Sequence, residues 1–189
     1  MGINFKIKFM KRLLILLFIP IVCFGQNDND SNKVSKEAIS AIYYIDVLGN
    51  PKYKSGDFYG AIADYSKAIE IDVNSETAYG NRGLAKFSLK DFYGAIADYN
   101  KAIEINSSNV SYYSRRASAK KKIEDNYGAI ADLTMVIKLE TEIVQRAEAY
   151  FRRGVIKGLL GNMEDACKDI KVAESLGYDI SEIAAACYP

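Results

Sequence analysis

One nine-residue phrase occurs three times in this chain and constrains its fold more than any other feature. It reads Asp-Phe-Tyr-Gly-Ala-Ile-Ala-Asp-Tyr at 57–65 and again at 91–99, and it returns in a looser form at 125–133. Successive copies are 34 residues apart. A fixed period of this length is typical of stacked helical hairpins, because one hairpin cannot bury its apolar face without neighbours. The repeat therefore predicts an all-α array.

Each copy of the phrase begins a predicted helix. In the first copy, apolar residues fall at spacing i, i+1, i+4, i+7 and i+8, which is one face of an α-helix: Ala61, Ile62, Tyr65, Ala68 and Ile69. An aspartate precedes each run and is placed to cap the helix by accepting hydrogen bonds from free backbone amides: Asp57, Asp91 and Asp125. Partner helices are predicted between the runs, at roughly 76–89, 111–123 and 146–160.

The two ends of the array depart from the regular pattern. A first helix is expected from about residue 38, and Gly49-Asn50-Pro51 should end or kink it near Leu48. Proline inside a helix removes a hydrogen bond and clashes with the preceding turn, at a cost of about 3 kcal/mol. At the other end, Gly177 can stop the last repeat, and a short apolar stripe follows a capping-box pattern. We therefore expect a degenerate first repeat and a capping helix over 178–189.

The first 25 residues have the pattern of a secretory signal peptide. Four basic residues precede a short apolar run at 13–24, which ends before the small residue Gly25. The run is shorter than the roughly 20 apolar residues that span a membrane. Cleavage after Gly25 is expected, with lipidation of Cys23 and an uncleaved anchor as the less favoured alternatives, and Met10 as an alternative start. The mature protein should then begin with a flexible leader at 26–39 and be periplasmic or extracellular in a bacterium.

Composition excludes several classes of function. The chain has no histidine, which removes Ser-His and Cys-His nucleophile pairs and histidine-bearing zinc sites. Cleavage would remove four basic residues and leave 21 Lys+Arg against 24 Asp+Glu, a net charge near −3 that argues against nucleic acid as a partner. No pair of carboxylates stands out from ordinary surface spacing. We expect a protein that is not an enzyme and needs no metal or cofactor.

Large and small residues recur at fixed positions within each repeat, most clearly in the second: Tyr79, Gly83, Phe87, Asp91, Ala95, Tyr99 and Ala102. This pattern resembles tetratricopeptide repeats, and the resemblance covers four units from about 40 to 177. It implies a right-handed α-solenoid of about four helical hairpins. One departure concerns three glycines that stand where the family usually has an acidic residue: Gly60, Gly94 and Gly128.

The family resemblance also implies a function and a binding face. In such arrays the first helix of each repeat lines a concave groove, which takes an extended or helical peptide. The implied role is a non-catalytic scaffold for a peptide or protein partner, and the basic residues favour an acidic one. Groove candidates are Asn81, Leu84, Phe87, Arg115, Ser118, Lys121, Lys122, Arg152 and Val155. The alternative for Lys120–Lys122 is a solvated charge run at a helix C-terminus, where the helix dipole favours cations.

Some members of the family hold the C-terminal carboxylate of a partner in a two-carboxylate clamp. Asn50, Asn81 and Arg115 stand at three of its five positions. Asp46 and Ser111 stand where the two lysines should be. Because Asp46 would repel an anionic ligand, this clamp is not expected here.

Two cysteines remain after the predicted cleavage, Cys167 in the fourth repeat and Cys187 in the expected cap. After export, a disulfide between them would close a loop of about 20 residues and contribute on the order of 3 kcal/mol. Two buried thiols that pack as small apolar side chains are the alternative.

A structural role is the alternative function. The array could self-associate end to end or through its irregular first repeat, as a component of the cell envelope. Fold alone does not separate this role from partner binding.

Overall fold

A computed structural model describes residues 37–181, 183 and 187. The predicted signal peptide and most of the predicted leader lie outside the described residues. Among the residues described, no helix combines the length and the apolar character that crossing a bilayer requires.

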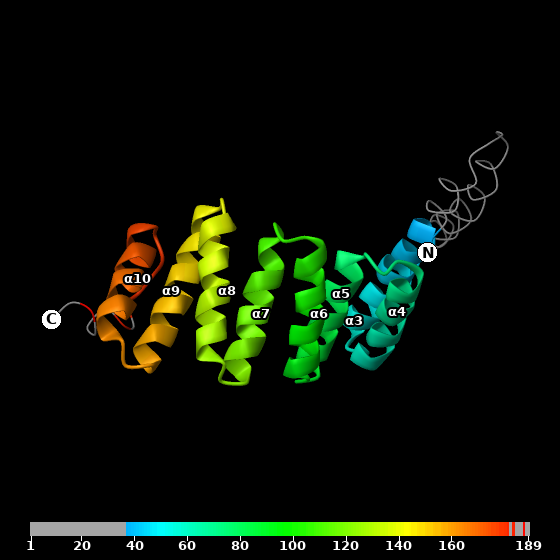
Figure 1. Ribbon diagram of the computed structural model, residues 1–189, viewed down its shortest axis with the longest axis horizontal. Coiled ribbons are helices and arrows are strands. Elements are labelled where there is room, and N and C mark those ends of the chain that lie inside the picture. The colour runs from blue at the N-terminus through cyan, green and yellow to red at the C-terminus, as the bar shows by residue number, and fades with distance from the viewer. Residues whose placement is uncertain (1–36, 182, 184–186, 188–189) are drawn as a thin grey trace, which may run out of the picture. The chain divides into compact units, whose positions relative to one another are not determined.

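The described chain is a row of helices, each packed beside the next (Figure 1). Residues 37–42, the π-helix η1 (Tyr43–Gly49) and α3 (Asn50–Ser55) make up the first helix of the first repeat. The remaining helices are α4 (Phe58–Ile71), α5 (Glu76–Ser88), α6 (Phe92–Ile105), α7 (Val110–Lys122), α8 (Asn126–Leu139), α9 (Ile143–Leu159) and α10 (Met163–Ser175). The closest pairs are α5–α6, α7–α8 and α9–α10, which are the hairpins of repeats two to four. The predicted all-α solenoid is confirmed.

The repeated phrase supplies two of the three main buried positions of α4, α6 and α8, and α10 buries the corresponding positions with a different sequence. Each of α4, α6, α8 and α10 buries the same three positions: Ala61, Tyr65, Ala68; Ala95, Tyr99, Ala102; Ala129, Leu133, Val136; Ala166, Ile170, Ala173. The tyrosine rings lie directly against glycines of the preceding helix. A Cβ atom on Gly83 would stand 2.9 Å from the Tyr99 ring, so that position has no room for a larger residue. The phrase repeats because every hairpin must present the same surface to its partner helix.

The three predicted aspartate caps are confirmed. The carboxylates of Asp57, Asp91 and Asp125 each accept a hydrogen bond at 2.9 Å from the backbone amide three residues on. Those three amides belong to the glycines that replace the family's acidic residue: Gly60, Gly94 and Gly128. A Cβ atom at any of them would collide with the capping carboxylate. A side chain at any of these positions would therefore require the capping carboxylate to shift.

We expected the first helix to end or kink near Leu48. It does not end there. It widens into η1, where the Asn50 amide donates to the Ile45 carbonyl five residues earlier, and it continues as α3 with Pro51 in its first turn. Proline has no amide hydrogen to donate, and it is tolerated in the first turn of an α-helix, where the amides have no partner within that helix. The chain therefore passes the proline without leaving the helix, and the first repeat is irregular as predicted.

The predicted capping helix over 178–189 falls partly on residues 182, 184–186 and 188–189, which lie outside the described residues. Residues 178–180 have no regular structure, and 181, 183 and 187 lie in turns, with the Ile183 amide bonded to the Ile180 carbonyl at 2.9 Å. Ile180 and Cys187 are nevertheless buried against Ile170 of α10. Gly177 ends α10 with a φ of +91°, the left-handed conformation predicted for it. The segment packs on the last hairpin of the array.

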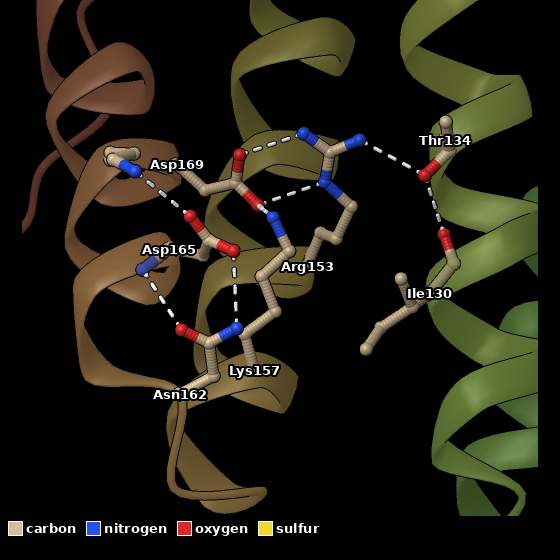
Figure 2. Close-up of polar contacts among 8 residues, drawn as sticks. Ile130, Thr134, Arg153, Lys157, Asn162, Asp165 and Asp169 are labelled. Atoms are coloured by element: carbon tan, nitrogen blue, oxygen red, sulfur yellow. Dashed lines mark hydrogen bonds and ion pairs between the residues drawn. The ribbon is translucent and has the colours of Figure 1, made fainter.

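A buried aspartate in the second helix of repeats two, three and four binds an arginine and a lysine of the helix before it. The bonded groups lie 2.6–3.0 Å apart in all three cases: Asp98 with Arg82 and Lys86, Asp132 with Arg116 and Lys120, Asp169 with Arg153 and Lys157. Each arginine also donates to a side chain of the previous repeat: Ser66, Asn100 or Thr134. Figure 2 shows Arg153 of α9 between Asp169 of α10 and Thr134 of α8. One guanidinium therefore connects three helices.

This polar network was missed at the level of sequence, although a signal for it was present. The pattern Tyr-x-x-Arg-x-x-x-Lys recurs in three first helices: 79–86, 113–120 and 150–157. In each, the guanidinium lies 5.4–5.6 Å from the centre of the tyrosine ring, a cation–π arrangement. The first repeat has Leu48 in place of the arginine, and its Asp64 is paired, within the described residues, with Lys52 alone.

Removing one buried aspartate should destabilise the protein according to the number of cations it holds. Asp132→Ala leaves Arg116 and Lys120 without a carboxylate, so we expect a loss of about 3 kcal/mol in the free energy of unfolding. Asp64→Ala is the matched control, because Lys52 is 41% exposed and can return to water, and it should cost about 1 kcal/mol or less. Urea unfolding followed by circular dichroism measures both. Equal losses in the two variants would show that pairing with an arginine adds no stability beyond pairing with a lysine.

Candidate peptide-binding groove

Three adjoining hollows follow the first helices of repeats two to four, and together we call them the groove. The α5–α7 hollow, of about 150 Å³, is lined by Leu84, Phe87, Tyr99, Arg115 and Ser118. The apolar hollow, of about 300 Å³, is lined by Ala117, Ser118, Lys121, Lys122, Phe151, Arg152, Val155 and Ile156. The arginine hollow, of about 210 Å³, is bordered by Arg115 and Arg152 with Val110, Ser111, Ser114, Val136, Glu140, Gln145, Glu148 and Ala149. Shared residues make the three continuous.

The structure brings eight of the nine predicted groove residues to these hollows. Leu84 and Phe87 reach the α5–α7 hollow, and Lys121, Lys122 and Val155 reach the apolar hollow. Three predicted residues line two hollows each: Arg115, Ser118 and Arg152. Asn81 lies outside all three, and Ser114 and Gln145, which were not predicted, line the arginine hollow.

Two arginines of the groove differ from the arginines of the buried network. Arg115 and Arg152 directly precede Arg116 and Arg153, which are held by aspartates. Arg152 instead donates to two neutral hydroxyls, Ser114 Oγ at 3.0 Å and Ser118 Oγ at 2.7 Å. Its guanidinium is 3.7 Å from the carboxylate of Glu148, an exposed residue, and such pairs contribute little.

The other carboxylate at the rim of the arginine hollow is already bonded. Glu140 accepts hydrogen bonds from the backbone amides of Thr141 and Glu142, at 2.9 and 3.0 Å. The arginine hollow therefore presents two guanidinium groups beside two carboxylates, of which Glu148 is weakly paired with Arg152.

Comparison with known proteins agrees with this geometry. The chain matches the family described as tetratricopeptide repeat over residues 77–109, and the one described as TPR repeat over 49–90. The first TPR of Spaghetti (RPAP3), solved with the HSP90 peptide SRMEEVD, is 30% identical, with 66% of this chain and 95% of that chain covered and a TM-score of 0.60. The chain belongs to the tetratricopeptide repeat family.

Other relatives support the same assignment. The crystal structure of MamA protein is 26% identical to this tetratricopeptide repeat chain, covering 72% of it and 73% of MamA with a TM-score of 0.67. The first TPR domain of human RPAP3 is 30% identical, with 67% and 96% of the two chains covered and a TM-score of 0.58. Curated proteins yielded no match.

Two of the three matched tetratricopeptide clamp positions, Asn50 and Asn81, take part in internal hydrogen bonds. Asn50 Oδ1 accepts from the Tyr65 hydroxyl at 2.8 Å and from Asn81 Nδ2 at 3.1 Å. Asn50 Nδ2 donates to Asp46 Oδ1 at 3.0 Å. These amides are therefore occupied, and Asp46 adds a negative charge where a carboxylate would have to bind. The geometry supports the expectation that this repeat array lacks the two-carboxylate clamp.

Within the described part of the chain, no three or more cysteine, aspartate or glutamate residues are grouped to hold a metal ion. Cys167 and Cys187 are joined by a disulfide in the structure, with their Cα atoms 5.2 Å apart. Two arginines, two lysines and apolar side chains line this tetratricopeptide groove.

Burial changes the titration of the tyrosine below the groove. It raises the pKa of Tyr99 to about 12, and the nearby Arg115 opposes the shift through its charge and a hydrogen bond. Burial likewise raises the pKa of Tyr65 to about 12. Both phenols therefore keep their protons in the folded array well above the pH at which a free tyrosine ionises.

Ionisation of these tyrosines should destabilise the protein at alkaline pH. An unfolded tyrosine loses its proton near pH 10 and the folded ones near 12, so their stabilisation is complete below pH 10 and is lost as the pH rises to 12. A shift of this size corresponds to about 2–3 kcal/mol per residue. Urea unfolding at pH 9 to 11.5 should show that the free energy of unfolding falls less steeply with pH in Tyr99→Phe than in the wild type. It should fall less steeply still in Tyr65→Phe/Tyr99→Phe. An unchanged slope in both variants would contradict the assignment.

Proposed function

We propose that the protein is a non-catalytic scaffold that binds an acidic peptide or protein segment in the groove of α5, α7 and α9. The observation that carries the proposal is the position of Arg115 and Arg152, which border one hollow and have neutral hydroxyls as their close partners. Charge-assisted bonds from arginine to carboxylate are among the strongest polar contacts. The first TPR of RPAP3, solved with the peptide SRMEEVD, supports a peptide as the kind of ligand.

The lysines of α7 divide between structure and recognition. Lys120 is bound to Asp132 at 2.9 Å, so it belongs to the buried network. Lys121 and Lys122 line the apolar hollow. The mature chain would have a net charge near −3, yet four basic residues line one groove: Arg115, Lys121, Lys122 and Arg152. This local excess of positive charge favours an anionic partner there.

The proposed location is outside the cytoplasm, in the periplasm or beyond the cell, after removal of residues 1–25. This part of the proposal rests on the basic and apolar pattern of those residues. An oxidising compartment agrees with the pairing of Cys167 and Cys187.

Reversing the two groove charges should abolish binding. The test is affinity capture from the native envelope, comparing wild type with Arg115→Glu/Arg152→Glu. The matched control is Lys67→Glu/Lys101→Glu, which makes the same change of charge at exposed lysines of α4 and α6. Loss of a charge-assisted contact of about 2 kcal/mol or more predicts at least a tenfold weaker capture in the first variant only.

A third variant should strengthen binding of the partner. Glu148→Gln removes the weak competitor of Arg152, so it should strengthen capture of an acidic partner by about two- to fivefold, as expected for an exposed ion pair of up to 1 kcal/mol. Capture of the same partner equally well by wild type and by the double groove variant would overturn the proposal.

Self-association is a second candidate function, favoured by apolar side chains on the first helix. Four of them are 46–60% exposed there: Ile39, Ile42, Tyr43 and Val47. Neighbouring exposed apolar residues of this kind are typical of interfaces. Light scattering should then give a dimer or larger species that Ile42→Ser/Val47→Ser returns to monomer. A monodisperse wild-type monomer at high concentration would exclude this function.

A further inference from the structure

Phe151 belongs both to the groove and to the packing of the C-terminal segment. From α9 it lines the apolar hollow beside Lys121 and Val155. The same ring stacks on Tyr178, with ring centres 4.5 Å apart and planes 27° from parallel. A wall of the groove is therefore supported by a residue that lies beyond the last repeat helix.

The position of Tyr178 depends on a short segment with few polar anchors. The Tyr178 amide bonds to the Ala173 carbonyl of α10, whereas the amides of Ser181 and Ile183 bond within the segment. Ile180 and Cys187 pack against Ile170 in the cluster that also contains Phe151 and Tyr178. The segment is held by this apolar packing and by the disulfide from Cys187 to Cys167 on α10.

The apolar hollow has the size and the surroundings to accept one large side chain of a bound peptide. Its volume is about 300 Å³, and an apolar cavity of about 150 Å³ suffices to hold benzene. Phe151, Val155 and Ile156 line it together with the basic residues Lys121, Lys122 and Arg152. The complementary ligand is a large apolar residue flanked by carboxylates.

We propose that this hollow anchors such an apolar residue of the acidic peptide, and that the Cys167–Cys187 disulfide sets the strength of the anchor by keeping Tyr178 against Phe151. The inference rests on the proposed function, because it requires the peptide to lie in the groove. The inference goes beyond the proposed function because it names a large apolar residue as the one selected and the Cys167–Cys187 disulfide as the bond that controls this selection.

Reduction would act on the anchor and leave the arginines unchanged. A dithiol reductant gives two electrons and two protons to the disulfide, which becomes two thiols while the reductant becomes a disulfide. The segment after Gly177 is then no longer cross-linked to α10 and gains conformational freedom. Tyr178 leaves the Phe151 ring for part of the time, and apolar contact in the hollow weakens. The carboxylate contacts of Arg115 and Arg152 do not involve this segment.

The experiment uses two fluorescein-labelled peptides of Glu and Ser residues that differ only at one central position, Leu or Ser. Fluorescence anisotropy with the oxidised mature protein should show about tenfold tighter binding of the Leu peptide, because the leucine side chain leaves water when it enters the hollow. After reduction with dithiothreitol and alkylation, this preference should fall to about twofold, with the affinity for the Ser peptide unchanged.

Tyr178 variants keep the test independent of cysteine chemistry. In oxidised protein, Tyr178→Ala should reproduce the loss of preference, and Tyr178→Phe, which preserves the stacked ring, should retain it. Circular dichroism confirms that each variant is folded. Intact mass after alkylation, with and without reductant, must show the disulfide in protein purified from its own compartment, and two free thiols there would overturn the proposal.

The outcomes separate this inference from the proposed function. If both peptides bind equally and Arg115→Glu/Arg152→Glu weakens both, the groove binds acidic peptides and only the apolar anchor is wrong. If neither peptide binds the wild type, both proposals fail. A Leu preference that survives reduction and Tyr178→Ala overturns the role of the disulfide.

Discussion

The buried aspartate in the second helix of each regular repeat is the interaction on which the rest of the structure depends. A carboxylate removed from water must be paired, and Asp98, Asp132 and Asp169 are paired with both an arginine and a lysine. Each arginine also bonds to the preceding repeat, so one carboxylate aligns three helices. This network also separates two kinds of arginine. Arg116 and Arg153 are bound inside the array, and the residues just before them are directed to the groove.

The second helices carry the stacking surface that all repeats share, and the first helices carry most of the positions that differ between repeats. The second helices repeat almost unchanged because each must bury the same face against its neighbours. The first helices share the network positions and differ elsewhere, most usefully at Asn81, Arg115 and Arg152, which occupy one position in successive repeats. At this position repeat two has an amide that is bonded internally, whereas repeats three and four have arginines that border the groove. A solenoid can change its ligand by substitution at such positions while its stacking surfaces remain intact.

At the C-terminal end, the segment that covers the last repeat also contacts a residue that lines the groove. A terminal repeat has an open face that must be covered, and here Tyr178, Ile180 and Cys187 cover it. Because Phe151 contacts both this cover and the apolar hollow, the stability of the cover and the shape of the hollow are coupled. The first repeat contrasts with this end. It lacks the network arginine, passes a proline through a π-turn and leaves apolar side chains exposed.

The sequence by itself determined the all-α array, the helix caps at Asp57, Asp91 and Asp125, and most of the groove, because these follow from local periodicity and from a position's place in the repeat. It did not determine how Pro51 would be accommodated, since that depends on neighbours that keep the first helix in place. It also did not show which arginines are neutralised or that Phe151 touches Tyr178. Adjacent arginines such as Arg115 and Arg116 look alike in sequence. Only tertiary packing decides which one meets a buried carboxylate and which one is left for a ligand.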